Sequence, residues 1–397
     1  MDPHYTEWLN LLVRWVHMIV GIAWIGASFY FIWLENNLNR KSPRDGLAGD
    51  LWAIHGGGIY HLEKYKLAPP QMPADLHWFK WEAYTTWFSG ITLLAIVYYL
   101  NAQLYLLAPG SELSSLQGIG ISVASLIAGW FIYDGLCNSA LGKRPALLGL
   151  VILVLLVAAS WALTQVFSGR AAYIHIGAIT GTMMVGNVFR VIMPGQRNLV
   201  AALKEGREPD PTAPAKAMLR SRHNNYLTLP VLFIMISNHF PSTYGSEWNW
   251  AILFAVAILS VLVRHYFNTR HESNKFLWTL PAAAIGMMAL AFVTKPASLA
   301  SSADSAGVAM EQVTLAQVTS IVNNRCASCH AANPSSEMFS APPAGVILET
   351  AEDVLKYAAQ IHAQSVATQA MPLGNMTGML VEERMLIGRW YDAQAAK

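Results

Sequence analysis

The chain has 397 residues and a formal net charge of +2, and hydrophobic residues make up 54% of it. Charged residues make up only 13%, which is about half the share usual in soluble globular proteins. A wholly soluble protein is therefore excluded, and no basic patch points to a nucleic-acid partner. The three cysteines (Cys137, Cys326 and Cys329) do not form the pattern of a disulfide framework.

Eight segments are apolar enough to be transmembrane helices, which need about 20 mostly apolar residues. The sixth is short and contains Pro230, so it fits this pattern least well. The helices are expected near residues 12–33, 83–105, 116–136, 146–167, 172–193, 226–240, 249–267 and 277–294.

Basic residues indicate how these helices are oriented. The loops after the odd-numbered helices contain most of the Lys and Arg residues, such as Lys143 and Arg144 after the third helix, whereas the loops after helices two and six contain none. Cytoplasmic loops are enriched in these residues. We therefore expect a multi-pass protein of the bacterial inner membrane with both termini in the periplasm.

The first and fifth helices have related sequences. WVHMIVGIAWIGASFYF at 15–31 and YIHIGAITGTMMVGNVF at 173–189 align His17 with His175, which suggests a bundle of two parallel four-helix repeats. Small residues at helix interfaces can imitate such similarity. Histidines at membrane depth are candidate functional residues. His17 and His175 would either act on a substrate catalytically or bind a haem b iron, and the alternative is hydrogen bonding between helices.

Two polar segments on the cytoplasmic side are candidates for substrate binding. The loop after the first helix is rich in aromatic residues and glycine and contains His55, and SRHNNYLTLP at 221–230 leads into the sixth helix with His223 and Asn225. Such side chains could bind a planar, polar anion. The alternative is that the aromatic residues lie in the lipid interface and the polar groups cap helices.

Residues 296–311 are small and polar, which predicts a flexible linker between a membrane domain (1–295) and a C-terminal domain (312–397). The latter contains CASCH at 326–330. In this motif, Cys326 and Cys329 would bind one haem c covalently and His330 would be an axial iron ligand. A zinc site would need a second ligand pair, and a redox pair would be expected beside a βαβ pattern.

The second axial ligand is expected in QAMPLGNMTGM at 369–379, where Met371 precedes a proline that restricts the backbone. Met376 is the next candidate, and His362 is a weaker one. Helices are predicted at 314–325 and 381–394, with Trp390 of the second packing on the first. The predicted fold class is all-α: a polytopic bundle of about eight helices followed by a small, class I-like cytochrome c domain.

The sequence resembles the bacterial membrane-bound urate oxidases, or urate hydroxylases, over essentially its whole length. The matching segments are the first helix, IHGGGIYHLEKYKLAPPQMP at 54–73, LHWFKWEAYTTWFSG at 76–90, HNNYLTLPVLFIMISNHFP at 223–241 and the CASCH domain. The resemblance implies conversion of urate to 5-hydroxyisourate, with electrons passed to the fused haem c and on to a soluble cytochrome c or terminal oxidase. It implies no particular urate-binding residues.

The position of the substrate determines which cofactors are needed. A urate site near His17 and His175 would lie close to a docked haem domain, whereas one near His55 or His223 would lie a bilayer thickness away, about 30 Å. The second arrangement would require an intermediate haem. The alternative function is an electron-transfer membrane subunit that oxidises a quinol and has no urate chemistry.

Overall fold

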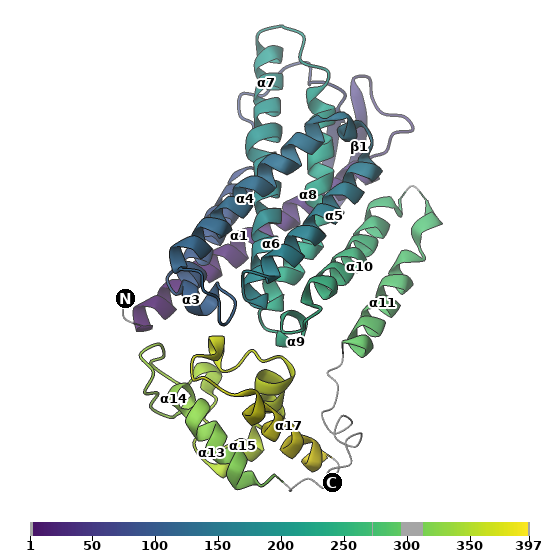
Figure 1. Ribbon diagram of the computed structural model, residues 1–397. Coiled ribbons are helices and arrows are strands. Elements are labelled where there is room, and N and C mark those ends of the chain that lie inside the picture. The colour runs from purple at the N-terminus through teal and green to yellow at the C-terminus, as the bar shows by residue number, and fades with distance from the viewer. Residues whose placement is uncertain (1–2, 272, 295–312, 396–397) are drawn as a thin grey trace.

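The computed structural model describes residues 3–271, 273–294 and 313–395, which are mostly helical (Figure 1). The predicted linker at 296–311 lies outside the described residues. The main helices of the N-terminal unit are α1 (Pro3–Asn37), α2 (Trp81–Leu94), α4 (Ser115–Asn138), α5 (Pro145–Thr164), α6 (Gly169–Gly186), α7 (Met193–Lys204), α8 (Ala213–Ser237), α10 (Asn249–Thr269) and α11 (Thr279–Val293).

Six helices in the described part of the chain are long and apolar enough to cross a membrane. They are α1, α4, α5, α6 with its continuation into α7, α10, and the helix that ends in α11. The other two predicted spans correspond to α2 and α8. Because α2 is short and α8 contains several charged and amide residues, the expected number of eight spans stays a prediction.

Short elements connect the main helices. A π-helical turn, η1 (Ala95–Tyr99), extends α2 towards α3 (Ala102–Tyr105), and another, η3 (Asn187–Ile192), joins α6 to α7. The remaining connectors are η2 (Ala140–Lys143), α9 (Pro241–Tyr244) and η4 (Asn274–Phe276). A capping box at Ser114 and Gln117 begins α4, which satisfies backbone groups that the helix leaves without intrahelical partners.

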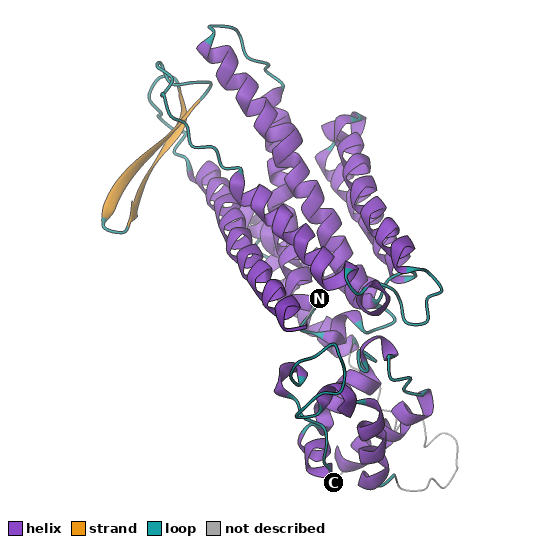
Figure 2. Ribbon diagram, turned by 90° about the vertical axis from the view of Figure 1, so that its left-hand side faces the viewer, coloured by secondary structure: helices purple, strands orange, loops and turns teal. Residues whose placement is uncertain are grey.

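The all-α prediction is wrong for the loop after α1, which forms an antiparallel hairpin of β1 (Leu47–His55) and β2 (Gly58–Tyr65). Gly56 and Gly57, both with positive φ, make its tight turn. The hairpin projects from the end of the bundle (Figure 2). The hairpin was not predicted because aromatic residues lie on both faces of its strands. The strands therefore show no simple alternation of polar and apolar residues.

Helix α6 lies at the centre of the N-terminal unit and packs against α4, α5 and α8. Ten of its residues are buried, among them Tyr173, His175 and Ile179. Glycine allows close packing at one crossing: a Cβ at Gly129 of α4 would lie 2.6 Å from Cγ2 of Ile179. The helices that surround α6 therefore form one compact core.

The C-terminal unit is built from α13 (Leu315–Arg325) and α17 (Val381–Ala395), which pack against each other. Both predicted terminal helices are present, and Trp390 is buried with Val318 and Val322 of α13. Between them lie α14 (Ala327–His330), η5 (Pro343–Gly345), α15 (Ala351–Lys356), α16 (Ala358–Ile361), η6 (His362–Ala367) and η7 (Leu373–Asn375).

The C-terminal unit lies against the end of the bundle that contains α3 and α9 (Figure 1). Two contacts are close: Gly374 of η7 lies beside Leu104 of α3, and Gly245 after α9 lies beside Thr368 after η6. The hairpin and α7 are at the opposite end of the bundle.

Candidate functional site

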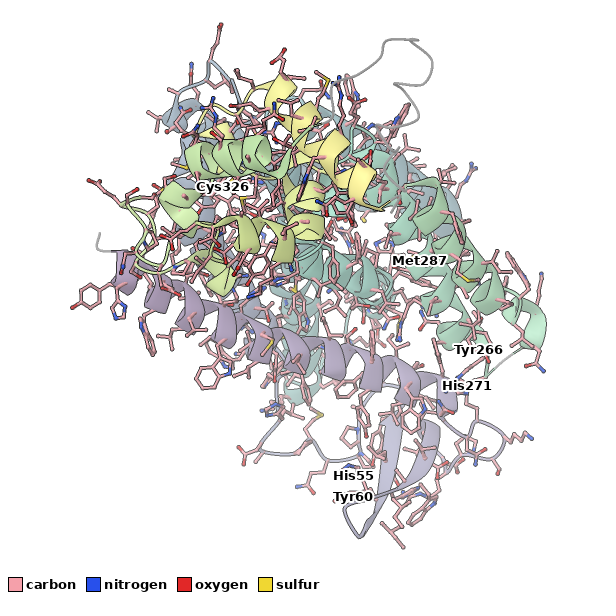
Figure 3. All side chains as sticks on the ribbon, turned by 90° about the horizontal axis from the view of Figure 1, so that it is seen from below. His55, Tyr60, Tyr266, His271, Met287 and Cys326 are labelled. Atoms are coloured by element: carbon pink, nitrogen blue, oxygen red, sulfur yellow. The ribbon has the colours of Figure 1, made fainter. Side chains whose placement is uncertain are left out.

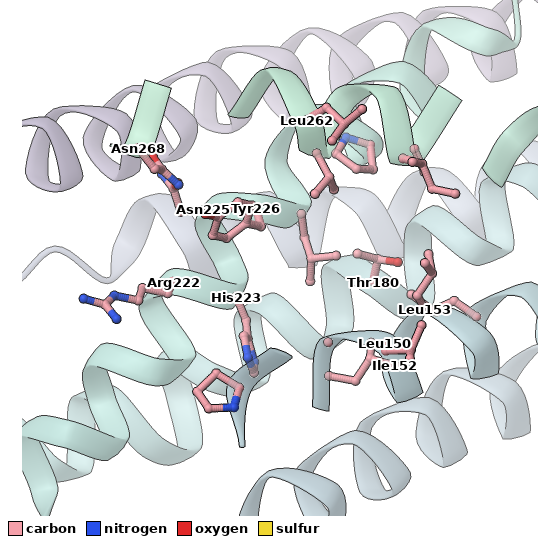
Figure 4. Close-up of a pocket in the computed structure, with 18 of the residues that line it drawn as sticks. Leu150, Ile152, Leu153, Thr180, Arg222, His223, Asn225, Tyr226, Leu262 and Asn268 are labelled. Atoms are coloured by element: carbon pink, nitrogen blue, oxygen red, sulfur yellow. The ribbon is translucent and has the colours of Figure 1, made fainter. Parts of the chain in front are cut away.

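A cavity of about 660 Å³ lies between α1, α5, α6, α8 and α10 (Figure 4). This volume is within the range of small-molecule sites. Polar residues, including His223, Asn225 and Asn268, gather at one end of the cavity, and aliphatic residues of α5 lie at the other. Two of the predicted substrate-binding residues, His223 and Asn225, thus line the same cavity.

These two residues lie inside α8 because the helix begins thirteen residues before the predicted start of the sixth helix. The prediction that SRHNNYLTLP only leads into the helix is therefore wrong, and the helix also continues through Pro230. Within a continuous helix, His223 and Tyr226 are three residues apart and share a face. Both line the cavity.

The orientation of His223 is set by a chain of hydrogen bonds. Asn187 donates from Nδ2 to the Tyr133 hydroxyl at 2.8 Å, and that hydroxyl lies 2.8 Å from Nδ1 of His223. The tyrosine oxygen accepts from an amide and has its own proton to donate, so we assign Nδ1 as the acceptor of that proton. The neutral imidazole then carries its proton on Nε2, the nitrogen that does not contact Tyr133.

An ion pair with a buried arginine supports this chain. Arg220 donates from Nη2 to Asp134 at 2.6 Å and from Nη1 to Asn187 at 3.2 Å, and its guanidinium lies 5.0 Å from the centre of the Tyr133 ring. Arg220 is 3% exposed. The sequence analysis named neither Arg220 nor Asn187 as a site residue. The sequence feature that could have identified them is a pair of polar residues on the inward faces of neighbouring helices. Recognising this feature requires knowing where α8 begins.

The second polar group on the cavity wall is centred on Asn225. Its Oδ1 accepts from Nε of Arg264 at 2.8 Å and from Nδ2 of Asn268 at 2.9 Å. Arg264 is 8% exposed and stacks on Phe29, with its guanidinium carbon 3.8 Å from the ring centre. This arginine is therefore part of the interior of the bundle.

His175 and His17 occupy separate hydrogen-bonded positions. His175 of α6 is fully buried, with Nε2 2.6 Å from Ser122 Oγ and Nδ1 2.7 Å from the Ala171 carbonyl. In α1, Nδ1 of His17 is 3.0 Å from the Thr86 carbonyl. Neither histidine lines the cavity. Since both ring nitrogens of His175 are hydrogen-bonded to protein groups, this arrangement favours a role in joining helices.

His55 lies at the end of β1, beside the hairpin turn (Figure 3). It is exposed and is not among the residues that line the cavity. The structure therefore does not bring His55 together with His223 and Asn225.

Cys326 of the CASCH motif is the N-cap residue of α14, and the rest of the motif forms this short helix. Cys326 and Cys329 have free thiols, and burial raises the pKa of the Cys326 thiol to about 11. Nδ1 of His330 lies 3.0 Å from the Val346 carbonyl, an arrangement that fixes the ring and leaves Nε2 as the nitrogen for a metal. These donors fit a covalently attached haem.

The candidate second ligands differ in their surroundings. Met371 is half-buried, and Arg384 donates to its carbonyl at 2.8 Å, which holds the loop in place. Met376 is 48% exposed, whereas Met379 is packed in the core. His362 stacks on Tyr391 with ring centres 4.5 Å apart.

No group of three or more His, Cys, Asp or Glu residues that could hold a metal ion occurs in the part of the chain that the structure describes. A haem iron bound by one histidine and one methionine does not need such a group.

The model of the family described as urate oxidase N-terminal matches residues 3–295. This chain belongs to that family. The match covers the whole helical bundle and the hairpin, and it ends before the C-terminal unit. No curated protein and no solved structure matches the chain.

The cavity lies entirely within the urate oxidase N-terminal unit. Along α8, fourteen residues separate His223 from Ser237, which corresponds to roughly 21 Å at 1.5 Å per residue. The C-terminal unit contacts α9, just beyond this end of α8, so the length of α8 lies between the polar end of the cavity and that contact.

Proposed function

We propose that the protein is a membrane-bound urate oxidase, or urate hydroxylase, that converts urate to 5-hydroxyisourate in the cavity between α5, α8 and α10. The observation that carries this proposal is the family match over residues 3–295, which includes every residue of the cavity. The cavity also has the required chemistry, because its polar end combines an imidazole with side-chain amides.

The reaction needs an electron acceptor. The urate monoanion and one water molecule give 5-hydroxyisourate, one proton and two electrons. The oxygen of the product comes from water, and the acceptor that we propose is a c-type haem. Cys326, Cys329 and His330 would hold this group together with Met371, and it would accept one electron at a time, so each turnover would involve two transfers.

Three residues have proposed roles in the cavity. His223 donates from Nε2 to the anionic substrate, since its Nδ1 accepts from Tyr133. Tyr133 and Asn187 hold this tautomer and orientation. Charge-assisted hydrogen bonds of this kind are stronger than neutral ones. We place the substrate here rather than beside His17 and His175, because the two nitrogens of His175 are already hydrogen-bonded.

Aromatic residues of the bundle supply a route between the cavity and the C-terminal unit. The rings of Tyr133 and Trp130 have centres 6.2 Å apart. Nearer the C-terminal unit, the Tyr99 hydroxyl lies 2.6 Å from Ser122 Oγ, which is hydrogen-bonded to His175. Eight residues of α4 separate Trp130 from Ser122, a rise of about 12 Å. Tyrosine and tryptophan side chains can be oxidised and reduced, so this series could replace an intermediate haem b.

The protein would lie in the bacterial inner membrane with both termini and the C-terminal unit in the periplasm. The distribution of Lys and Arg between alternate loops supports this orientation. A soluble cytochrome c or a terminal oxidase would then accept the electrons.

The decisive experiment adds urate anaerobically to purified full-length protein and follows the absorbance of the reduced haem. We expect reduction by two electron equivalents per urate and formation of 5-hydroxyisourate. A haem that dithionite reduces but urate does not would contradict the proposal.

The aliphatic residues at the other end of the cavity favour a second candidate function, oxidation of a quinol by an electron-transfer subunit. Adding a quinol instead of urate in the same experiment separates the two. Reduction of the haem by the quinol but not by urate would establish the second function.

A further inference from the structure

Two residues that line the cavity each have a buried polar atom with no hydrogen-bond partner among the described residues: Nδ2 of Asn225 and Oδ1 of Asn268. Asn225 is fully buried. A buried polar group without a partner usually costs about 1–3 kcal/mol, and such groups are rare in folded proteins. A pair of them in neighbouring side chains of one cavity calls for a physical reason.

The neighbouring arginine determines which atoms remain without a partner. A guanidinium can only donate, so Arg264 requires the oxygen of Asn225 to face it. That same oxygen accepts from Asn268, which must therefore turn its nitrogen towards Asn225. Flipping either amide would place two donors or two acceptors against each other. Asn225 is thus left with a donor to offer, and Asn268 with an acceptor.

Arg264 is itself held in place. Its guanidinium stacks on Phe29 and is buried, and the backbone carbonyl of Asn268 accepts from Asn36 at 3.0 Å. The donor and the acceptor are therefore fixed before any ligand arrives, as preorganised recognition requires.

We propose that Asn225 and Asn268 together recognise an –NH–C(=O)– edge of urate, with Asn225 donating to the carbonyl oxygen and Asn268 accepting from the adjacent N–H. This inference rests on the proposed function and adds the mode of binding to it. Both residues line the cavity together with His223 (Figure 4). His223 lines the same cavity and would contact another part of the same ring system.

This pair distinguishes a purine from an oxidised quinone, although a quinol hydroxyl could both donate and accept here. A quinone has carbonyl acceptors but no N–H, so it would leave Oδ1 of Asn268 without a donor. A fused purine with adjacent N–H and C=O groups satisfies both. Sites whose buried polar groups stay unpaired with the wrong ligand reject it strongly.

The test measures urate binding and turnover with full-length protein carrying Asn268→Leu, which keeps the side-chain bulk and removes the acceptor together with the Nδ2 group that donates to Asn225. We expect the urate Kd to rise about tenfold, the loss of one hydrogen bond. The matched control is Asn249→Leu, since Asn249 also has a buried oxygen without a partner among the described residues but does not line the cavity. That variant should keep the wild-type urate Kd.

A second measurement needs no variant. Urates methylated singly at each ring nitrogen are tested on the wild-type protein, where methylation of the recognised N–H should abolish binding and methylation elsewhere should not. Equal binding of all the methylated urates, or an unchanged Kd in Asn268→Leu, would overturn the inference even if urate is oxidised. Selective binding without electron release would instead support the inference and contradict the proposed oxidation. A wild-type protein that binds no urate would contradict both.

Discussion

At the scale of single residues, the hydroxyl of Tyr133 controls the proton position on His223. It accepts from Asn187 and lies at hydrogen-bonding distance from Nδ1 of the imidazole. A tyrosine in this position can give its proton in one direction only, because the amide nitrogen on its other side is a donor. The tautomer of His223 therefore depends on a neighbouring residue of α4, which also lines the cavity.

The first prediction concerns Tyr133→Phe, which removes this hydroxyl and keeps the ring. Loss of one buried hydrogen bond costs about 1–3 kcal/mol, so kcat/KM for urate should fall by a factor of about 5 to 150. Anaerobic reduction kinetics measure this change. Cys137→Ala is the control, because Cys137 Sγ is 4.0 Å from the same nitrogen and its loss leaves the Tyr133 bond intact. Equal values of kcat/KM for urate in Tyr133→Phe and Cys137→Ala would contradict the prediction.

The second prediction compares Met371→Ala with Met376→Ala. Met371 is half-buried in a loop that Arg384 holds, whereas Met376 is 48% exposed. If Met371 is the iron ligand, its loss should leave the haem covalently attached but change the absorption spectrum and lower the reduction potential. Met376→Ala should keep the wild-type spectrum, and the reverse result would assign Met376 as the ligand.

The third prediction tests covalent attachment. Cys329→Ala removes one of the two thiols that would bond to the haem vinyl groups. A haem-stained band on a denaturing gel should be lost or strongly weakened relative to the wild type. A band of wild-type intensity would exclude haem c at this motif.

At the scale of elements, the apolar segments of the sequence predicted the long helices, but they did not predict where the polar part of α8 begins. All eight apolar segments are helical in the structure, whereas α8 begins at Ala213, in a stretch of polar and charged residues. An apolar window cannot detect a helix whose buried face consists of Arg220, Asn224 and Asn225, because these residues are buried against partners on other helices. His223 and Asn225 could thus be predicted as candidates, but Arg220, Asn187 and Asn268 could not.

The fourth prediction concerns the crossing of α4 and α6. In Gly129→Ala, the new methyl group would lie 2.6 Å from Ile179, and such overpacking typically costs about 1–3 kcal/mol. The thermal midpoint of the detergent-solubilised protein should fall by several degrees. In the control Gly135→Ala, on the same helix, nothing lies within 4 Å of the new methyl group. That variant should be as stable as the wild type or slightly more stable, since alanine favours helix. A thermal midpoint of Gly129→Ala equal to that of the wild type would contradict the prediction and would show that α6 can move to accommodate the methyl group.

At the scale of the whole molecule, two units meet at one end of the bundle. The predicted orientation of the helices indicates an end for this contact, but the sequence does not indicate which residues make it. The order of a membrane domain and a soluble domain follows from composition, because apolar segments stop before the CASCH motif. The contacts between Gly374 and Leu104 and between Gly245 and Thr368 join residues that are far apart in the chain. None of these residues has a charge or periodicity that would mark it as part of an interface.

The final prediction is that this contact sets the rate of electron transfer out of the bundle. A Cβ at Gly245 would lie 2.6 Å from the carbonyl oxygen of Thr368, so Gly245→Val should force the two units apart. Urate-driven reduction of the C-terminal unit should slow at least tenfold, while reduction by dithionite and covalent haem staining stay unchanged.

Two further variants decide whether separation of the units is the cause. Leu104→Glu disrupts the other contact, beside Gly374, and should slow the same step. Ser242→Val adds similar bulk at an exposed position of α9 and should have no effect. Since the polar end of the cavity is more than about 20 Å from the C-terminal unit along α8, even a small separation lengthens a route that is already long. Wild-type rates in both contact variants would mean that electrons leave the bundle somewhere else.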